Sequence, residues 1–226
     1  MLKETKVLLA FMLIFLVSFS CSSTKDRKPN SEADTITNTA NDAKEPKSAP
    51  TVSGTVVALD GPLRVAGNRI VDQNNEDFQL RGLSLFWSQW MGQYYTPEVV
   101  AWLKNDWQIT VIRAAMGVED FDGYLTNPET EKQKVFTIID AAIEQGLYVI
   151  VDWHSHHAKD HLEEAKAFFT EVAQKYGDQP YIIYDLYNEP LDVSWDTALK
   201  PYHEAVLAEI RKYDPDNMVI CGTPNW

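Results

Sequence analysis

The sequence is short of cysteine and of basic residues. It holds two cysteines, Cys21 and Cys221, too few for a framework of paired disulfides. Lys and Arg number 20 against 33 Asp and Glu, which gives a net charge of −13. Because nucleic acid is bound by basic surfaces, this balance argues against a nucleic-acid partner. Cys221 lies in a short apolar run and is predicted to be a small, buried core residue.

Long hydrophobic runs are also lacking. The apolar run over residues 7–17 is too short to span a membrane comfortably, but it follows Lys3 and precedes small residues and Cys21. This order predicts a signal peptide over residues 1–21. The ending Ser-Phe-Ser-Cys resembles a bacterial lipobox, so we expect a lipid anchor on Cys21 and a membrane-anchored lipoprotein of the cell envelope. Plain secretion is the alternative.

Residues 22–52 contain almost no apolar side chains and are rich in Ser, Thr, Asn, Asp, Lys and Pro. Such a segment cannot bury enough surface to offset the entropy lost on ordering. It is predicted to be a disordered polar linker, followed by one folded domain over residues 53–226.

The folded part alternates between β-rich and helical patterns. The sequence predicts a β-hairpin over residues 63–71, strands over 78–86, 109–114, 148–153, 181–187 and 218–221, and helices that start at Thr96 or cover 129–145, 161–176 and 198–213. Strands that alternate with helices indicate a parallel sheet of the α/β class. No Gly-rich phosphate loop is present, which argues against a doubly wound sheet and favours a (β/α)₈ TIM barrel. Five strands where a barrel needs eight predict an incomplete barrel, the first five βα units of a longer enzyme; a complete open sheet is the alternative.

Glu189 is the candidate for acid/base chemistry. Asn188, Glu189 and Pro190 follow an apolar strand, at the position where barrel enzymes present their chemical groups. To protonate a leaving oxygen, a glutamic acid needs a raised pKa, which burial or a second carboxylate can provide. A helix N-cap or a surface glutamate is the alternative.

Two further strands end in polar groups. Arg113 follows Val and Ile in a predicted interior strand, where it needs a partner, most simply a carboxylate of the site. His154 ends the next strand and is predicted to bind substrate, and His156, His157 and His161 are predicted to be loop residues. His154 and His156 could instead face one metal ion, but the later strands supply no obvious further ligands. We therefore predict no metal and no cofactor.

Four tryptophans lie at or beyond strand ends: Trp87, Trp90, Trp153 and Trp226. Aromatic rings stack on the apolar faces of sugars, so this placement suggests a glycan cleft, with core packing as the alternative, above all for Trp153. Trp102 and Trp107 belong to a predicted helix and its exit and are assigned to packing.

Together these motifs resemble glycoside hydrolase family 5, especially its bacterial endo-β-1,4-glucanases. The matching pieces are LRGLS at 80–84, IRAAM at 112–116, VDWH at 151–154, YNEP at 187–190 and GTPNW at 222–226. The resemblance implies a retaining glycosidase that cleaves internal bonds of cellulose or related β-glucans. Residues 53–226 would then be a partial glycoside hydrolase catalytic domain, and a monomer is expected.

The resemblance also implies a role for each site residue. Glu189 takes the acid/base position, and the substrate-binding positions match Arg113, His154, Asn188, Trp87, Trp90 and Trp226. The family's nucleophilic glutamate would lie on a strand beyond Trp226, so this chain alone is expected to be inactive. Phe86 departs from the family, where a histidine is common. A metal-dependent hydrolase using His154 and His156, or a non-catalytic glycan-binding lipoprotein, remain the alternatives.

Overall fold

The computed structural model describes residues 53–226. The predicted signal peptide (1–21), the lipidation site Cys21 and the predicted linker (22–52) lie outside the described residues. Within residues 53–226, none of the helices combines the length and apolar character needed to cross a bilayer.

A β-hairpin opens the described chain, as predicted. Strands β1 (Arg64–Ala66) and β2 (Arg69–Val71) pair antiparallel, and the turn between them uses Gly67 at φ 66°, a conformation that suits glycine. The short helix α1 (Val56–Asp60) precedes the hairpin and was not predicted. Five residues are too few to show a helical period, and α1 is held by tertiary contacts such as the 3.2 Å hydrogen bond from Val57 N to Gly146 O.

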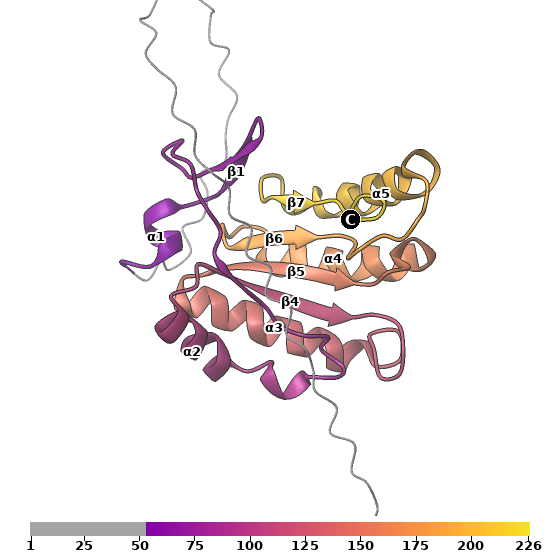
Figure 1. The fold of residues 1–226 in the computed structure, drawn as a ribbon, viewed down its shortest axis with the longest axis horizontal. Helices are drawn as coiled ribbons and strands as arrows, with labels where there is room; N and C mark the ends of the chain where they lie inside the picture. The colour runs from indigo at the N-terminus through magenta and orange to yellow at the C-terminus, as the bar shows by residue number, and fades with distance from the viewer. Residues whose placement is uncertain (1–52) are drawn as a thin grey trace, which may run out of the picture. The chain divides into compact units, whose positions relative to one another are not determined.

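The main sheet has five parallel strands in chain order: β3 (Gly82–Ser84), β4 (Val111–Gly117), β5 (Tyr148–His154), β6 (Ile182–Asp185) and β7 (Val219–Ile220). Figure 1 shows the arrows of β4, β5, β6 and β7 pointing the same way, with β1 of the hairpin near the ends where these strands begin. Strand β3 is shorter than the predicted segment 78–86, because Phe78 bonds to Ile70 O of the hairpin instead. Because the five strands are parallel, their C-terminal ends lie at the same edge of the sheet.

Helices connect the strands. They are α2 (Pro97–Trp107), α3 (Pro128–Gln145), α4 (Leu162–Tyr176) and α5 (Lys200–Ile210), with short helical turns η1 (Gly92–Tyr94), η2 (Ala158–His161) and η3 (Trp195–Leu199). The local signals act as the sequence suggests. Thr96 caps α2 by accepting from Val99 N ahead of Pro97, and α3 ends where Gly146 adopts a left-handed conformation.

Strand residues divide by alternation between two faces of the sheet. One set packs under the helices and is fully buried, including Ile112, Val151 and Trp153. The Trp153 ring lies 5.7 Å from Phe168 and 5.1 Å from Tyr124, so this tryptophan belongs to the core, which was its alternative assignment. The other set carries the polar side chains described below.

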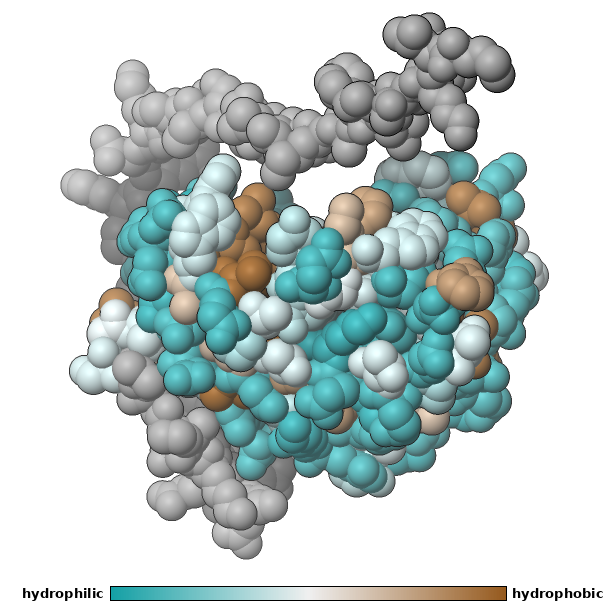
Figure 2. Space-filling model, turned by 90° about the horizontal axis from the view of Figure 1, so that it is seen from below, coloured by the Kyte–Doolittle hydropathy of each residue, from teal (hydrophilic) through white to brown (hydrophobic). Residues whose placement is uncertain are grey.

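Three packing predictions were wrong. Trp102 and Trp107 on α2 are 53% and 58% exposed and contact one another at 6.4 Å. Cys221 is exposed because β7, which it follows, is the last strand of the described sheet. Figure 2, seen from the side of α2 and α3, shows a mainly hydrophilic surface with separate small hydrophobic patches.

Candidate active site

The site is built from side chains at alternate positions of three adjacent strands. Arg113 on β4, Asp152 and His154 on β5, and Asp185 on β6 share the face of the sheet opposite to the buried tryptophan. Asp152 and Asp185 are register partners on neighbouring parallel strands, so their carboxylates lie side by side. Asp152 is fully buried.

Arg113 lies between these two carboxylates. Its Nη2 is 2.9 Å from Oδ2 of Asp152 and 2.9 Å from Oδ2 of Asp185, and its Nε donates to the same Asp185 oxygen at 3.2 Å. Nη2 also donates to Oδ1 of Asn188 at 3.0 Å. Arg113 therefore has two carboxylate partners where the sequence predicted one. Its contacts with Asp152, Asp185 and Asn188 fix the plane of the guanidinium group.

The pKa values of Arg113 and Asp185 are both raised in this cluster, for different reasons. Burial disfavours the charged form of Arg113, but Asp152 and Asp185 outweigh it, so the pKa of the guanidinium is raised. Burial, followed by the charge of Asp152, raises the pKa of Asp185 to about 6, although Arg113 opposes the shift. Asp185 therefore holds its proton to a higher pH than an ordinary aspartic acid does.

His154 is tied into the same cluster. Its Nδ1 lies 2.5 Å from Asp152 Oδ2 and 3.4 Å from Arg113 Nη1, and its ring meets Trp87 edge-on at 4.4 Å. A metal ion on Nδ1 would have to displace the bond to Asp152 next to the Arg113 cation. Among residues 53–226, no group of three or more His, Cys, Asp or Glu is placed to hold a metal.

Asn188 and Glu189 follow β6 at the edge where the polar tips meet. Asn188 is 6% exposed, and its Nδ2 is buried with no hydrogen-bond partner among the described residues. The Glu189 side chain is 46% exposed, and its backbone is left-handed at φ 41°. Glu189 is not a helix N-cap, because the next helical turn starts at Trp195, and its exposed side chain lines a pocket at the surface.

That pocket has a volume of about 260 Å³. Its lining comprises Arg113, Asp185, Tyr187, Asn188, Glu189, Pro190, Ile220, Cys221, Gly222, Thr223 and Trp226. Trp226 is 66% exposed on one side of it. Trp87 and Trp90 stack on each other at 4.9 Å and reach the site through the contact of Trp87 with His154. The predicted site residues thus form one connected region.

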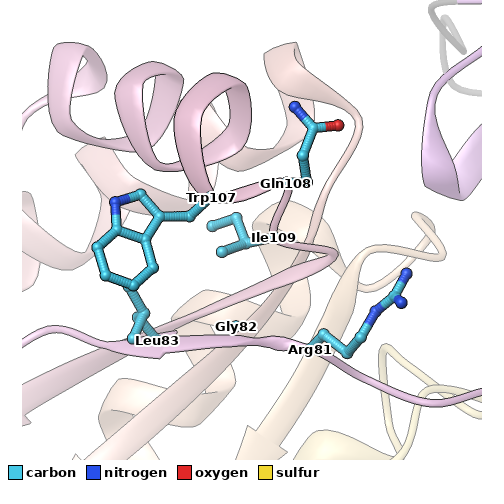
Figure 3. Close-up of a pocket in the computed structure, with 6 residues that line it drawn as sticks. All are labelled: Arg81, Gly82, Leu83, Trp107, Gln108 and Ile109. Carbon is cyan, nitrogen blue, oxygen red and sulfur yellow. The ribbon is translucent and has the colours of Figure 1, made fainter.

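A second cavity, of about 320 Å³, lies at the other end of the sheet, between β3 and the end of α2. Figure 3 shows the Trp107 indole reaching toward Leu83 while Arg81 points away from it. Gly82 in its lining pairs with Val111, the first residue of β4, which places this cavity far from the strand ends that carry Glu189. Its lining has no carboxylate or histidine, so we assign it no chemistry.

Comparison with known proteins identifies the family of this domain. The model of the family "Cellulase (glycosyl hydrolase family 5)" matches residues 71–226. The chain belongs to glycosyl hydrolase family 5. Relatives within this group include Endoglucanase Z of Dickeya dadantii, 49% identical over 168 residues, and Endoglucanase A of Evansella cellulosilytica, 46% identical over 153 residues. These matches cover 73% and 66% of this chain but 39% and 31% of the relatives, so the chain spans well under half of their length.

Solved structures share the fold of the described residues. A protein from Cytophaga hutchinsonii is 55% identical with a TM-score of 0.75, over 76% of this chain and 56% of that one. The catalytic domain of Thermobifida fusca endoglucanase Cel5A (E5) is 38% identical with a TM-score of 0.73, over 76% of this chain and 57% of that one. Since such domains are (β/α)₈ barrels, the predicted fold class is confirmed, with five barrel strands among the described residues.

Sequence reasoning missed three residues of this family 5 site. Asp152 and Asp185 each occupy an alternate position of a predicted strand, so period two from His154 could have found Asp152. His156, assigned to a plain loop, places its Nδ1 3.2 Å from the carbonyl oxygen of Glu189. No sequence signal indicates that contact, because the two residues belong to different loops.

Proposed function

We propose that the protein is an endo-β-1,4-glucanase that cleaves internal bonds of cellulose or related β-glucans with retention of configuration. The observation that carries this proposal is the position of Glu189, half-exposed in a pocket beside the Arg113–Asn188 pair. The relatives named Endoglucanase Z and Endoglucanase A support the same substrate class.

In the proposed reaction, Glu189 donates its proton to the glycosidic oxygen as the bond to the anomeric carbon breaks. A second carboxylate, about 5 Å from the first, attacks that carbon and forms a covalent glycosyl-enzyme. Water then replaces the carboxylate and returns its proton to Glu189. The resemblance to family 5 implies that this nucleophile lies on a strand that is not among the five described, and Asp152 and Asp185 are both engaged by Arg113.

The remaining site residues are proposed to bind the sugar. The unpartnered Nδ2 of Asn188 can donate to a sugar hydroxyl. Arg113 and His154 hold the floor of the site through Asp152. Trp87 and Trp90 on one side, and Trp226 on the other, offer rings to successive glucose units, as aromatic side chains in sugar clefts do.

The test measures release of reducing ends from carboxymethylcellulose by the complete product of the gene. Glu189→Gln is expected to lower kcat by about 10³-fold, because the amide cannot donate the proton. Glu164→Gln, an exposed glutamate on α4, is the matched control and should keep full activity. Residues 1–226 alone should show no turnover. Turnover by residues 1–226 that Glu189→Gln abolishes would contradict the expected inactivity of this chain, and full activity of Glu189→Gln in the complete gene product would contradict the role of Glu189.

Two rival functions predict different results. A metal-dependent hydrolase using His154 and His156 would lose activity in chelator and regain it with a divalent metal. A non-catalytic glycan-binding protein would bind cello-oligosaccharides without turnover by the complete gene product. We expect activity that is insensitive to chelator.

We further propose that the mature protein is anchored through a lipid on Cys21. The composition of residues 1–21 and the lipobox-like ending support this proposal. Detergent phase partitioning of the protein expressed in bacteria should place it in the detergent phase, and Cys21→Ser should move it to the aqueous phase. Aqueous partitioning of the unaltered protein would favour plain secretion.

A further inference from the structure

His156 has no role in the proposed mechanism, yet it lies against the acid. Its Nδ1 is 3.2 Å from the main-chain carbonyl oxygen of Glu189 and 3.9 Å from Oε2 of the same residue. A carbonyl oxygen can only accept, so the imidazole nitrogen must carry the proton and donate it. Among the described residues, this is the hydrogen bond that Glu189 accepts.

Glu189 needs such a restraint because its backbone is strained. A φ of 41° is left-handed, a region that residues other than glycine rarely adopt because it is sterically strained. The following residue is Pro190, whose ring further restricts the residue before it. Strain of this kind persists only where neighbouring groups fix the conformation.

His156 is itself held in place from two sides. Its carbonyl oxygen accepts a 3.0 Å hydrogen bond from the Tyr187 hydroxyl, and its ring lies 5.8 Å from Trp87. Two hydrogen bonds therefore run in opposite directions between the loop after β5 and the segment after β6, one from Tyr187 to His156 and one from His156 to Glu189. Because the His156 ring also contacts Trp87, the second hydrogen bond connects a proposed sugar-binding ring to Glu189.

We infer that His156 is a positioning residue for Glu189, whose Nδ1–H bond holds the strained backbone and so aims the carboxyl group into the pocket. The expected effect on kcat rests on the proposed function, whereas the expected effect on the Glu189 backbone does not. His156 acts through Glu189, so its loss should lower kcat while substrate binding is nearly kept.

The test uses three substitutions in the complete gene product. The Nδ2 of asparagine stands close to where the imidazole Nδ1 stands, so His156→Asn should keep kcat within about threefold, as the donor is nearly conserved. Glutamine moves the donor farther out and leucine removes it, so His156→Gln and His156→Leu should lower kcat by about 10- to 100-fold with little change in KM. The neighbouring exposed residue supplies the control, His157→Leu, which should behave like the unaltered enzyme.

The outcomes separate this inference from the proposed function. Unchanged kcat in His156→Leu, or a loss confined to KM, would overturn the positioning role. If the unaltered gene product hydrolyses no β-glucan, the proposed function fails, and the inference is then decided by crystal structures of the complete gene product and its His156→Leu variant. Relaxation of the Glu189 φ out of the left-handed region in His156→Leu supports the inference, and an unchanged φ overturns it.

Discussion

Arg113 donates from both Nε and Nη2 to a single oxygen of Asp185, at 3.2 and 2.9 Å. This two-point contact fixes the plane of the guanidinium, and the same Nη2 then reaches Asn188, the residue before Glu189. A carboxylate on β6 thereby sets the position of groups next to the proposed acid.

The raised pKa of Asp185 predicts a dependence of stability on pH. Its pKa is about 6 in the folded state against 3.8 in the unfolded chain, so the folded state binds more protons between these values. Folding stability from this group is therefore greatest at low pH and falls as pH rises through about 4 to 6, by about 3 kcal/mol in all. Asp185→Asn removes this slope while its amide oxygen can still accept from Arg113.

Urea unfolding of the two proteins at a series of pH values measures this effect. The stability of Asp185→Asn relative to the unaltered chain should increase as pH rises from about 4 to 7. A difference that is constant over this range would show that the carboxyl is not held in the protonated form by burial and Asp152.

Two exposed tryptophans form a matched pair for testing whether Trp90 stacks on the sugar. Trp90 is 49% exposed beside the site, and Trp102 is 53% exposed on the outer helix α2. Trp90→Ala should weaken binding of cellotetraose by about 1–2 kcal/mol, since it removes a stacking face, and Trp102→Ala should not change it. Isothermal titration would show this difference, and equal affinities of the two variants would show that Trp90 does not stack on the sugar.

Core packing makes a third prediction, with a control of the same residue type. Trp153 is fully buried against Phe168 and Phe169, whereas Trp107 is 58% exposed. Trp153→Ala should lower the free energy of unfolding by about 3–5 kcal/mol because it leaves a cavity. Trp107→Ala should change it by less than about 1 kcal/mol. A small effect at Trp153 would mean that this ring is not part of the core.

Most of the fold could be predicted from the sequence because its signals are local. Thr96 with Pro97 starts a helix, Gly146 ends one, and apolar runs mark the buried strands, as the structure has them. Helix α1 could not be predicted, since its five residues depend on contacts with the turn at Gly146, far along the chain.

The site was predictable where a polar residue stands out against apolar neighbours. Arg113, expected at a strand end, lies within β4 because that strand runs on to Gly117, whereas His154 ends β5 and Glu189 follows β6, and the parallel sheet brings the three together. Asp152 and Asp185 are less visible, because a carboxylate within a strand has meaning only once its cation is known. The contact between His156 and Glu189 joins two loops, and loop conformation follows from the assembled fold rather than from local sequence.

The most direct test of the account is the dependence of the Glu189→Ala rate on the leaving group. The complete gene product is given cellotetraose, whose leaving group needs a proton, and 2,4-dinitrophenyl cellobioside, whose leaving group does not. If Glu189 is the general acid, the variant should lose about 10³-fold or more on cellotetraose but release the first equivalent of dinitrophenolate at nearly the unaltered rate. Equal losses of that first step on both substrates would contradict the assignment of Glu189 as the proton donor.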